Sequence, residues 1–214
     1  MIVLPAATAF DKQIPKQKFY EKAALNPTLK KAFREQIKSI CWRNKIAPDV
    51  LNLAKGKDVE ELQIFEVHLN GAQIDETVLR QIDRAIPYHI LFLLIRQEGV
   101  RAAIAYKETA GAKGAIARVE RYYYTDWMAA ADLTLRLEGL SMDAVYENFV
   151  RQIAGDALDG QSASLKESVA EQGRRERLVK QIAALEAKIR REKQPKKKFE
   201  LVTQLRGLQN TIDV

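Results

Sequence analysis

The chain has 214 residues, of which 47% are hydrophobic and 29% charged, so its composition suits one domain with an appendage or two small domains. No apolar run approaches the roughly 20 residues of a membrane span, and the first residues do not resemble a secretory signal, so we expect neither. Cys41 is the single cysteine, which excludes an internal disulfide and a cysteine-rich zinc module and fits a cytoplasmic protein.

The net charge of +7 is unevenly distributed along the chain. Residues 174–206 hold 12 Lys/Arg and 4 Asp/Glu, a local net charge of +8, so the remainder sums to −1. A near-neutral body with one basic arm predicts an anionic partner for that arm.

A helix is predicted near the start of the chain. Residues 4–20 are expected to be extended, because two prolines oppose helix there. Asn26 and Pro27 are typical of a helix start, as cap and first helical residue. Apolar residues at helical spacing then predict a helix from 27 to about 44, with one face formed by Leu29, Phe33, Ile37, Ile40 and Cys41.

Two strands and a second helix are predicted next. Residues 50–53 and 59–69 are rich in apolar and β-branched residues and flank a Lys-Gly-Lys-Asp turn, which favours two strands. Asp75 is suited to cap a helix that ends before Pro87. The apolar face of that helix is formed by Val78, Leu79, Ile82 and Ile86.

The centre of the sheet is predicted from a nearly continuous apolar run over 88–95, typical of a strand buried on both faces. A Glu-Gly turn then leads into a strand over 100–108, and another strand returns over 115–124. Alternating leucines predict one more strand over 133–140.

The chain ends in a predicted helical hairpin. Ser141 is expected to cap a helix over 142–153, and a Gly-, Asp- and Ser-rich linker follows. Beyond it, two apolar seams with spacings of 4, 3 and 4 lie on either side of Pro195, which cannot sit inside one straight helix. The seam residues are Leu178, Ile182, Leu185 and Ile189, then Leu201, Leu205, Leu208 and Ile212.

These elements predict an α+β fold. A mixed, mostly antiparallel sheet with flanking helices is expected over 1–155 and a linker over 156–164. An antiparallel helical hairpin, a short coiled coil, is expected over 165–214.

The basic side chains of the hairpin are the main candidate site. Lys and Arg along a helix can follow a phosphate backbone without identifying bases, and Phe199 is the one aromatic residue among them, so binding should be sequence-tolerant. An acidic protein partner and a merely solvated helix face remain alternatives. The candidate residues are Arg174, Arg175, Arg177, Lys180, Lys188, Arg190, Arg191, Lys193, Lys196, Lys197, Lys198 and Arg206.

A second candidate is a nuclease-like set formed by Glu61, Glu66 and His68. Two carboxylates can hold a divalent cation, and a basic side chain can steady the attacking water. Glu66 and His68 share a strand face, whereas Glu61 is on the other, so ordinary strand positions are the alternative. We expect no bound metal or cofactor.

Six segments, taken in order, together span nearly the whole chain: residues 14–20, 64–66, 85–88, 125–127, 146–153 and 192–201. As a set they resemble the bacterial domain-of-unknown-function family 4391. The resemblance implies a genomic setting beside DNA methyltransferases and superfamily-2 helicases, in restriction-like and phage-defence clusters. It implies no catalytic residue.

We therefore expect a non-catalytic accessory subunit of a DNA-directed defence or restriction-modification system. Its partners would be DNA, a DNA methyltransferase or a helicase, without a membrane. A metal-dependent nuclease is the alternative, and a homodimer formed through the hairpin is a further possibility.

Overall fold

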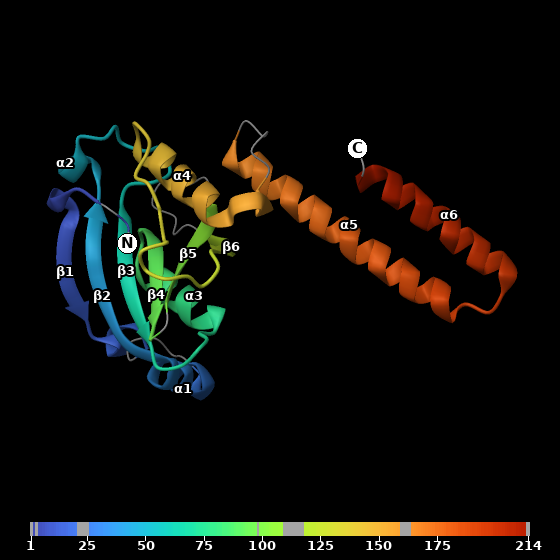
Figure 1. Ribbon diagram of the computed structural model, residues 1–214, viewed down its shortest axis with the longest axis horizontal. Coiled ribbons are helices and arrows are strands. Elements are labelled where there is room, and N and C mark those ends of the chain that lie inside the picture. The colour runs from blue at the N-terminus through green and yellow to red at the C-terminus, as the bar shows by residue number, and fades with distance from the viewer. Residues whose placement is uncertain are drawn as a thin grey trace. The chain divides into compact units, whose positions relative to one another are not determined.

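The computed structural model describes residues 2, 4–20, 26–97, 99–108, 118–158 and 164–212, with side chains to residue 209. The chain divides into two compact units, Met1–Gly155 and Asp156–Val214 (Figure 1). Most of the predicted linker and the start of the strand predicted over 115–124 lie outside the described residues. Among the residues described, no helix combines the length and apolar character needed to cross a membrane.

The first unit is built on one sheet of six strands that lie side by side in chain order. Strands β3 and β4 are parallel and all other neighbours are antiparallel, so the predicted mixed, mostly antiparallel sheet is confirmed. The strands are β1 (Ala9–Ile14), β2 (Ile37–Ile46), β3 (Leu62–Leu69), β4 (His89–Arg96), β5 (Gly99–Glu108) and β6 (Arg118–Tyr124).

Three helices flank the sheet, α1 (Pro27–Gln36), α3 (Glu76–Ala85) and α4 (Met142–Ala154). Two of them begin at the predicted caps, since the side chains of Asn26 and Ser141 accept hydrogen bonds from the backbone N–H groups of Leu29 and Ala144 at 2.8 and 3.3 Å. The short elements are η1 (Ala6–Thr8), η2 (Lys16–Phe19), α2 (Pro48–Leu51) and η3 (Gly155–Ala157).

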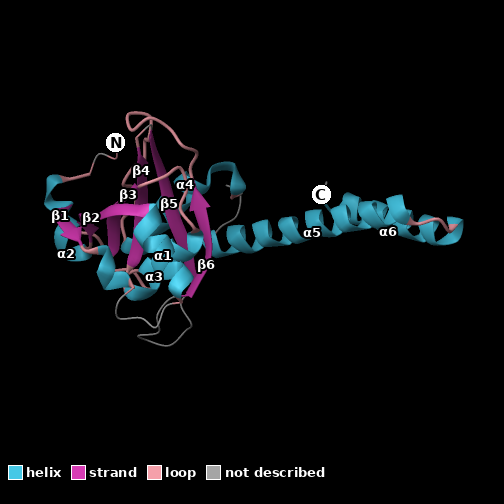
Figure 2. Ribbon diagram, turned by 90° about the horizontal axis from the view of Figure 1, so that it is seen from below, coloured by secondary structure: helices cyan, strands magenta, loops and turns pink. Residues whose placement is uncertain are grey.

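Helices α1 and α3 cover one face of the sheet (Figure 2). Phe33 of α1 and Ile82 of α3 are fully buried in a cluster with Phe65 of β3 and Phe92 of β4, whose rings meet edge to face at 6.4 Å. Aromatic and branched side chains at alternating strand positions supply this half of the core.

Helix α4 packs on the opposite face. Strand alternation places His89 on the side of β4 away from Phe92, and the His89 ring lies 4.5 Å from the Tyr146 ring of α4. The Tyr146 hydroxyl donates to the Ala105 carbonyl at 2.8 Å and accepts from the Lys107 N–H at 3.1 Å. This tyrosine therefore fixes α4 to the backbone of β5.

A buried ion pair joins α3 to the sheet. Lys107 Nζ lies 2.8 Å from Asp83 Oδ1, and the two side chains are 3% and 0% exposed. The ammonium also donates to the Tyr88 carbonyl at 2.8 Å, and the Tyr122 hydroxyl donates to Asp83 Oδ2. Burial raises the pKa of Asp83, and the attraction of Lys107 opposes that rise.

The first helix is shorter than the sequence predicts. It ends at Gln36, and the chain continues at once as β2, so Cys41 lies on a strand and not on a helix face. Ile37 and Ile40 satisfy a helical spacing, but β-branched residues also suit a strand. Hydrogen bonding to β1 and β3 on either side decides the outcome.

Two predicted strands are wrong. Residues 50–53 overlap α2, a single helical turn that begins at Pro48. Residues 133–140 form no strand, although Leu133 and Leu135 are buried and the residues between them exposed, as the alternation predicted. An extended loop that lies on a core has the same period of two, because alternation reports burial and not a hydrogen-bonded ladder.

The second unit consists of α5 (Leu165–Arg191) and α6 (Pro195–Ile212), which pack against each other as predicted (Figure 1). Ser164 caps α5 by accepting from the Glu167 N–H at 3.2 Å. Pro195 is the first residue of α6, where a missing backbone N–H costs nothing.

Replacing Asp83 by Asn should destabilise the protein by about 3–5 kcal/mol, because the Lys107 ammonium stays buried without its counter-charge. Urea unfolding measures the change. The matched control is Glu147→Gln, which breaks the partly exposed pair with Arg151 and should cost about 1 kcal/mol or less. Equal losses in the two variants would contradict the role assigned to the buried pair.

His89 should make the fold sensitive to acid. Burial, with the nearby Lys107 charge, lowers the pKa of His89 to about 3, against about 6.5 in an unfolded chain. Between these values the unfolded chain binds a proton that the folded chain does not, so stability falls as the pH falls, by about 2 kcal/mol at a pH of about 5.

The His89→Gln variant should lose about 2 kcal/mol less than the native protein between about pH 7 and about pH 5, as measured by urea unfolding. His68→Gln is the control, because the His68 side chain is 40% exposed. The explanation fails if both variants keep the native dependence on pH.

Candidate functional site

The apolar seam of the hairpin is the side on which its two helices meet. Leu178, Ile182, Leu185 and Ile189 of α5 are half-buried, and most of the residues between them are exposed. Leu201, Leu205 and Leu208 form the corresponding half-buried row on α6. The seam therefore orients both helices and leaves their outer faces to solvent.

A row of four cations, which we name the basic rail, follows one outer side of α5. Arg177, Lys180, Lys188 and Arg191 are all exposed, and their spacing of 3, 8 and 3 keeps them within a sector of about 80° on a helix of 3.6 residues per turn. The acidic residues of α5 fall outside that sector, at Glu167, Glu171, Glu176 and Glu186. The rail is therefore uniformly positive, whereas the rest of the helix is mixed.

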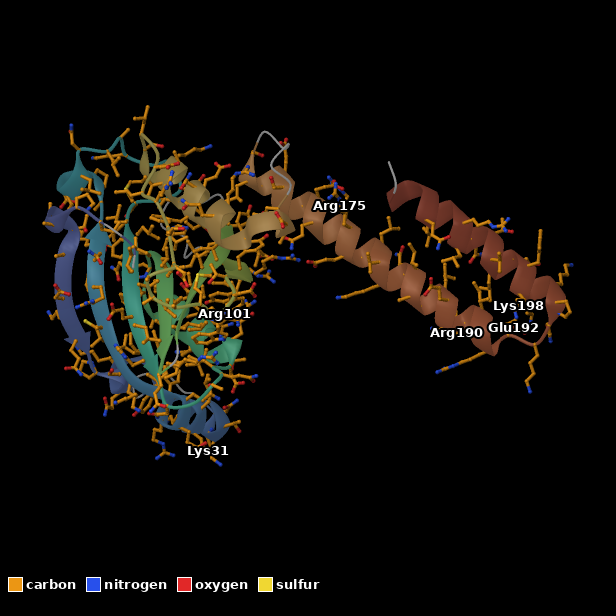
Figure 3. All side chains as sticks on the ribbon, in the orientation of Figure 1. Lys31, Arg101, Arg175, Arg190, Glu192 and Lys198 are labelled. Atoms are coloured by element: carbon orange, nitrogen blue, oxygen red, sulfur yellow. The ribbon has the colours of Figure 1, made fainter. Side chains whose placement is uncertain are left out.

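The turn between the helices adds a second group of cations. Lys193, Lys196, Lys197 and Lys198 are exposed, and the first turn of α6 contains no acidic residue to balance them. The N-terminus of α6 brings the positive end of its dipole to this turn, and the C-terminus of α5 brings the negative end of its own. Figure 3 shows Glu192 and Lys198 at this turn, so the tip also contains a carboxylate.

A groove of about 480 Å³ lies between the two helices near the tip. Lys188, Arg191 and Lys197 line it together with Glu192 and Glu200. Phe199, the one aromatic residue predicted among these cations, is 73% exposed. The sequence alone did not show that this ring faces solvent.

The other predicted cations of the hairpin lie outside the rail. Arg174 and Arg175 both form ion pairs with Glu171, the second at 3.8 Å. Such exposed pairs contribute little to stability but reduce the local positive charge. Arg190 and Arg206 are exposed on other sides of their helices.

The nuclease-like set is only partly brought together. His68 Nε2 lies 3.7 Å from Glu66 Oε2, whereas Glu61 contacts Lys45 at 3.4 Å and Gln63 at 2.5 Å. Glu61 and Glu66 thus belong to separate clusters. Within the described ranges, no group of three or more His, Cys, Asp and Glu side chains is arranged to hold a metal ion.

Glu66 belongs instead to a charge cluster on β1–β3. Arg43 Nε lies 3.0 Å from Glu66 Oε1, and Arg43 Nη1 lies 2.7 Å from Asp11 Oδ1. The Glu66 carboxylate is the main cause of a raised pKa for Arg43, and burial raises the pKa of the neighbouring Cys41 thiol. A cation at Glu66 would have to displace a guanidinium already bound there.

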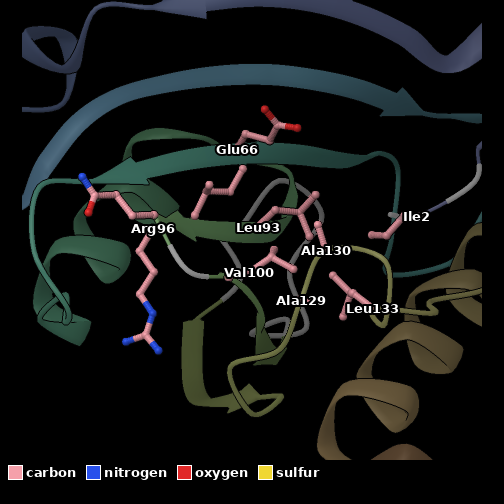
Figure 4. Close-up of a pocket in the computed structure, with 11 residues that line it drawn as sticks. Ile2, Glu66, Leu93, Arg96, Val100, Ala129, Ala130 and Leu133 are labelled. Atoms are coloured by element: carbon pink, nitrogen blue, oxygen red, sulfur yellow. The ribbon is translucent and has the colours of Figure 1, made fainter.

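The same carboxylate lies at the edge of a pocket of about 360 Å³ (Figure 4). Its wall is mainly apolar and comes from Leu93, Val100, Ala130 and Leu133, among others. A smaller space of about 180 Å³ adjoins Asp11 and Arg43. Sequence reasoning missed Arg43 and Asp11, because Arg43 was placed on a helix and Asp11 in an unassigned extended segment.

The family model for a domain of unknown function, DUF4391, matches residues 2–212, so the chain belongs to this family, as its sequence segments indicate. Neither a curated protein nor a solved structure matches the chain significantly. The description of the family names no function, so a proposal for this chain rests on the surfaces described above.

Leu185→Asp should separate α6 from α5, because it places a charge in the half-buried seam at a cost of about 1–3 kcal/mol. Faster proteolysis of α6 and a loss of helical circular dichroism would report the separation. Val179→Asp is the matched control, since Val179 is 56% exposed on the same helix.

Light scattering on the same proteins tests the homodimer. A native dimer that Leu185→Asp converts to a monomer would show that the seam pairs two chains. A native monomer would assign the seam to pairing within one chain.

Proposed function

We propose that this chain is a non-catalytic, nucleic-acid-binding accessory subunit that contacts phosphates through the basic rail. The observation that supports this best is the segregation of charge on α5, where Arg177, Lys180, Lys188 and Arg191 share one sector that contains no carboxylate. Cations that neutralise phosphates release counterions, which is the main source of sequence-independent affinity.

The dimensions of the rail suit an extended polyanion. Arg177 and Arg191 are 14 residues apart, which corresponds to about 21 Å along a helix that rises 1.5 Å per residue. Duplex DNA carries one phosphate per about 3.4 Å along each strand, so four cations can face several phosphates at once. Phosphate contacts position a protein without identifying sequence, and binding should be sequence-tolerant.

The proposed biological role is in DNA-directed defence or restriction-modification. The resemblance that supports it is to proteins encoded beside DNA methyltransferases and helicases, and either enzyme is the proposed protein partner. The first unit would then dock the partner while the hairpin holds DNA. Co-purification of the chain with the products of its neighbouring genes tests this role directly.

Four substitutions in the rail, Arg177→Gln, Lys180→Gln, Lys188→Gln and Arg191→Gln, should weaken binding to a fluorescent 30-bp duplex, followed by anisotropy at several salt concentrations. The slope of log K against log salt is negative, and each lost phosphate contact reduces its magnitude by about 0.9. The magnitude should therefore fall by about 3 to 4.

The matched control removes the same charge from exposed positions of the first unit, by replacing Lys55, Lys57, Arg84 and Arg136 with Gln. It should keep the native slope. Absence of binding by the native chain at low salt, or equal behaviour of the two variants, would overturn the proposal. Mg²⁺- or Mn²⁺-dependent cleavage that Glu66→Ala abolishes would replace it with the nuclease alternative.

A further inference from the structure

The charges of the first unit are unevenly distributed along its sequence. Residues 12–45 hold 10 Lys/Arg and 2 Asp/Glu, a net charge of +8 that equals the charge of residues 174–206. The rest of the chain therefore carries −9. The near-neutral sum outside the hairpin is correct, but it includes a strongly basic segment in the first unit.

The fold gathers part of this charge on the outer side of α1. Phe33 and Leu29 turn toward the core, and the helical spacing places the exposed Lys31 and Arg34 on the other side, with the half-buried Lys30 at its edge. Figure 3 shows Lys31 projecting from α1 away from the sheet. We name Lys30, Lys31, Arg34 and the exposed Lys38, which follows the helix, the α1 patch.

Little carboxylate charge opposes the α1 patch. Glu35 lies 3.8 Å from Lys31, but both side chains are more than 60% exposed, so this pair is weak. Asp75, which faces the end of α1, accepts a hydrogen bond from Gln36 at 2.6 Å. The patch thus keeps most of its positive charge.

The stability of α1 does not account for these cations. Lysines near the start of a helix oppose its dipole, and the first turn of α1 contains no acidic residue. The end of the helix already receives the Lys16 ammonium, which donates to the carbonyls of Arg34 and Ile37 at 3.2 and 2.5 Å. Lys30 and Lys31 are therefore not placed to stabilise the helix through its dipole.

We infer that the α1 patch is a second phosphate-contacting surface and that the chain holds one nucleic acid through both of its units. This inference rests on the proposed function, because it assigns the same class of ligand to a separate site. Two linked sites make the second contact intramolecular, which raises affinity without any new type of contact. Lysines and arginines on the outer side of a helix supply no base-specific geometry, so the patch should also be sequence-tolerant.

The test uses the full chain with Lys30, Lys31 and Arg34 replaced by Gln, and the same 30-bp duplex. The magnitude of the negative slope of log K against log salt should fall by about 2.7. The affinity at moderate salt should fall by about tenfold or more. Replacing Lys55, Lys57 and Arg84 with Gln removes the same charge elsewhere and should change neither quantity. Combining the α1 and rail substitutions should weaken binding beyond either set alone.

A charge-preserving variant, Lys30→Arg, Lys31→Arg and Arg34→Lys, separates charge from folding and should bind like the native chain. If the α1 variant binds like its control while the rail variant does not, the inference is wrong and the proposed function stands. If only the α1 variant loses binding, the patch is the principal site and the role of the hairpin is wrong. A native chain that binds no nucleic acid overturns both, and binding to phosphatidylserine vesicles would then assign the cations to a lipid surface.

Discussion

The ion pair between Asp83 and Lys107 is the constraint on which the first unit depends. A buried charge is tolerated only when its partner is held in place, so this pair fixes the position of α3 against β5. Tyr122 on β6 and the Tyr88 carbonyl before β4 satisfy the remaining polar atoms, which links three strands to one helix. Because α3 is the connection between β3 and β4, the same contact supports the single parallel pair of the sheet.

Sequence was sufficient where one local signal determined the structure. The apolar run of β4 and the caps at Asn26 and Ser141 identify their elements without tertiary information. The sequence did not predict that the first helix ends before Ile37, because that boundary depends on hydrogen bonds to two strands that lie elsewhere in the chain. The alternating leucines after β6 show the opposite failure, since a correct burial pattern belongs to a loop.

The candidate sites follow the same division. Strand alternation alone was enough to place His68 beside Glu66 and to separate Glu61 from both. The ion pair between Arg43 and Glu66 could not be inferred from the sequence. Arg43 lies on β2, and the spacing of apolar residues there had predicted a helix. The seam of the hairpin was predictable because apolar residues recur at spacings of 4, 3 and 4 in both helices, which places each set on one helix face.

The charge pattern argues for a ligand more strongly than the total charge does. Cations that serve only solubility are expected to be interspersed with anions, as they are on much of a typical surface. Here two segments of +8 alternate with stretches that together carry −9, and each basic segment places cations on one side of an exposed helix. Concentrating like charges costs repulsion within the folded chain, and a polyanion that contacts both helices would offset that cost. Such segregation occurs in both compact units, and the proposed contact with a phosphate backbone would account for it in each.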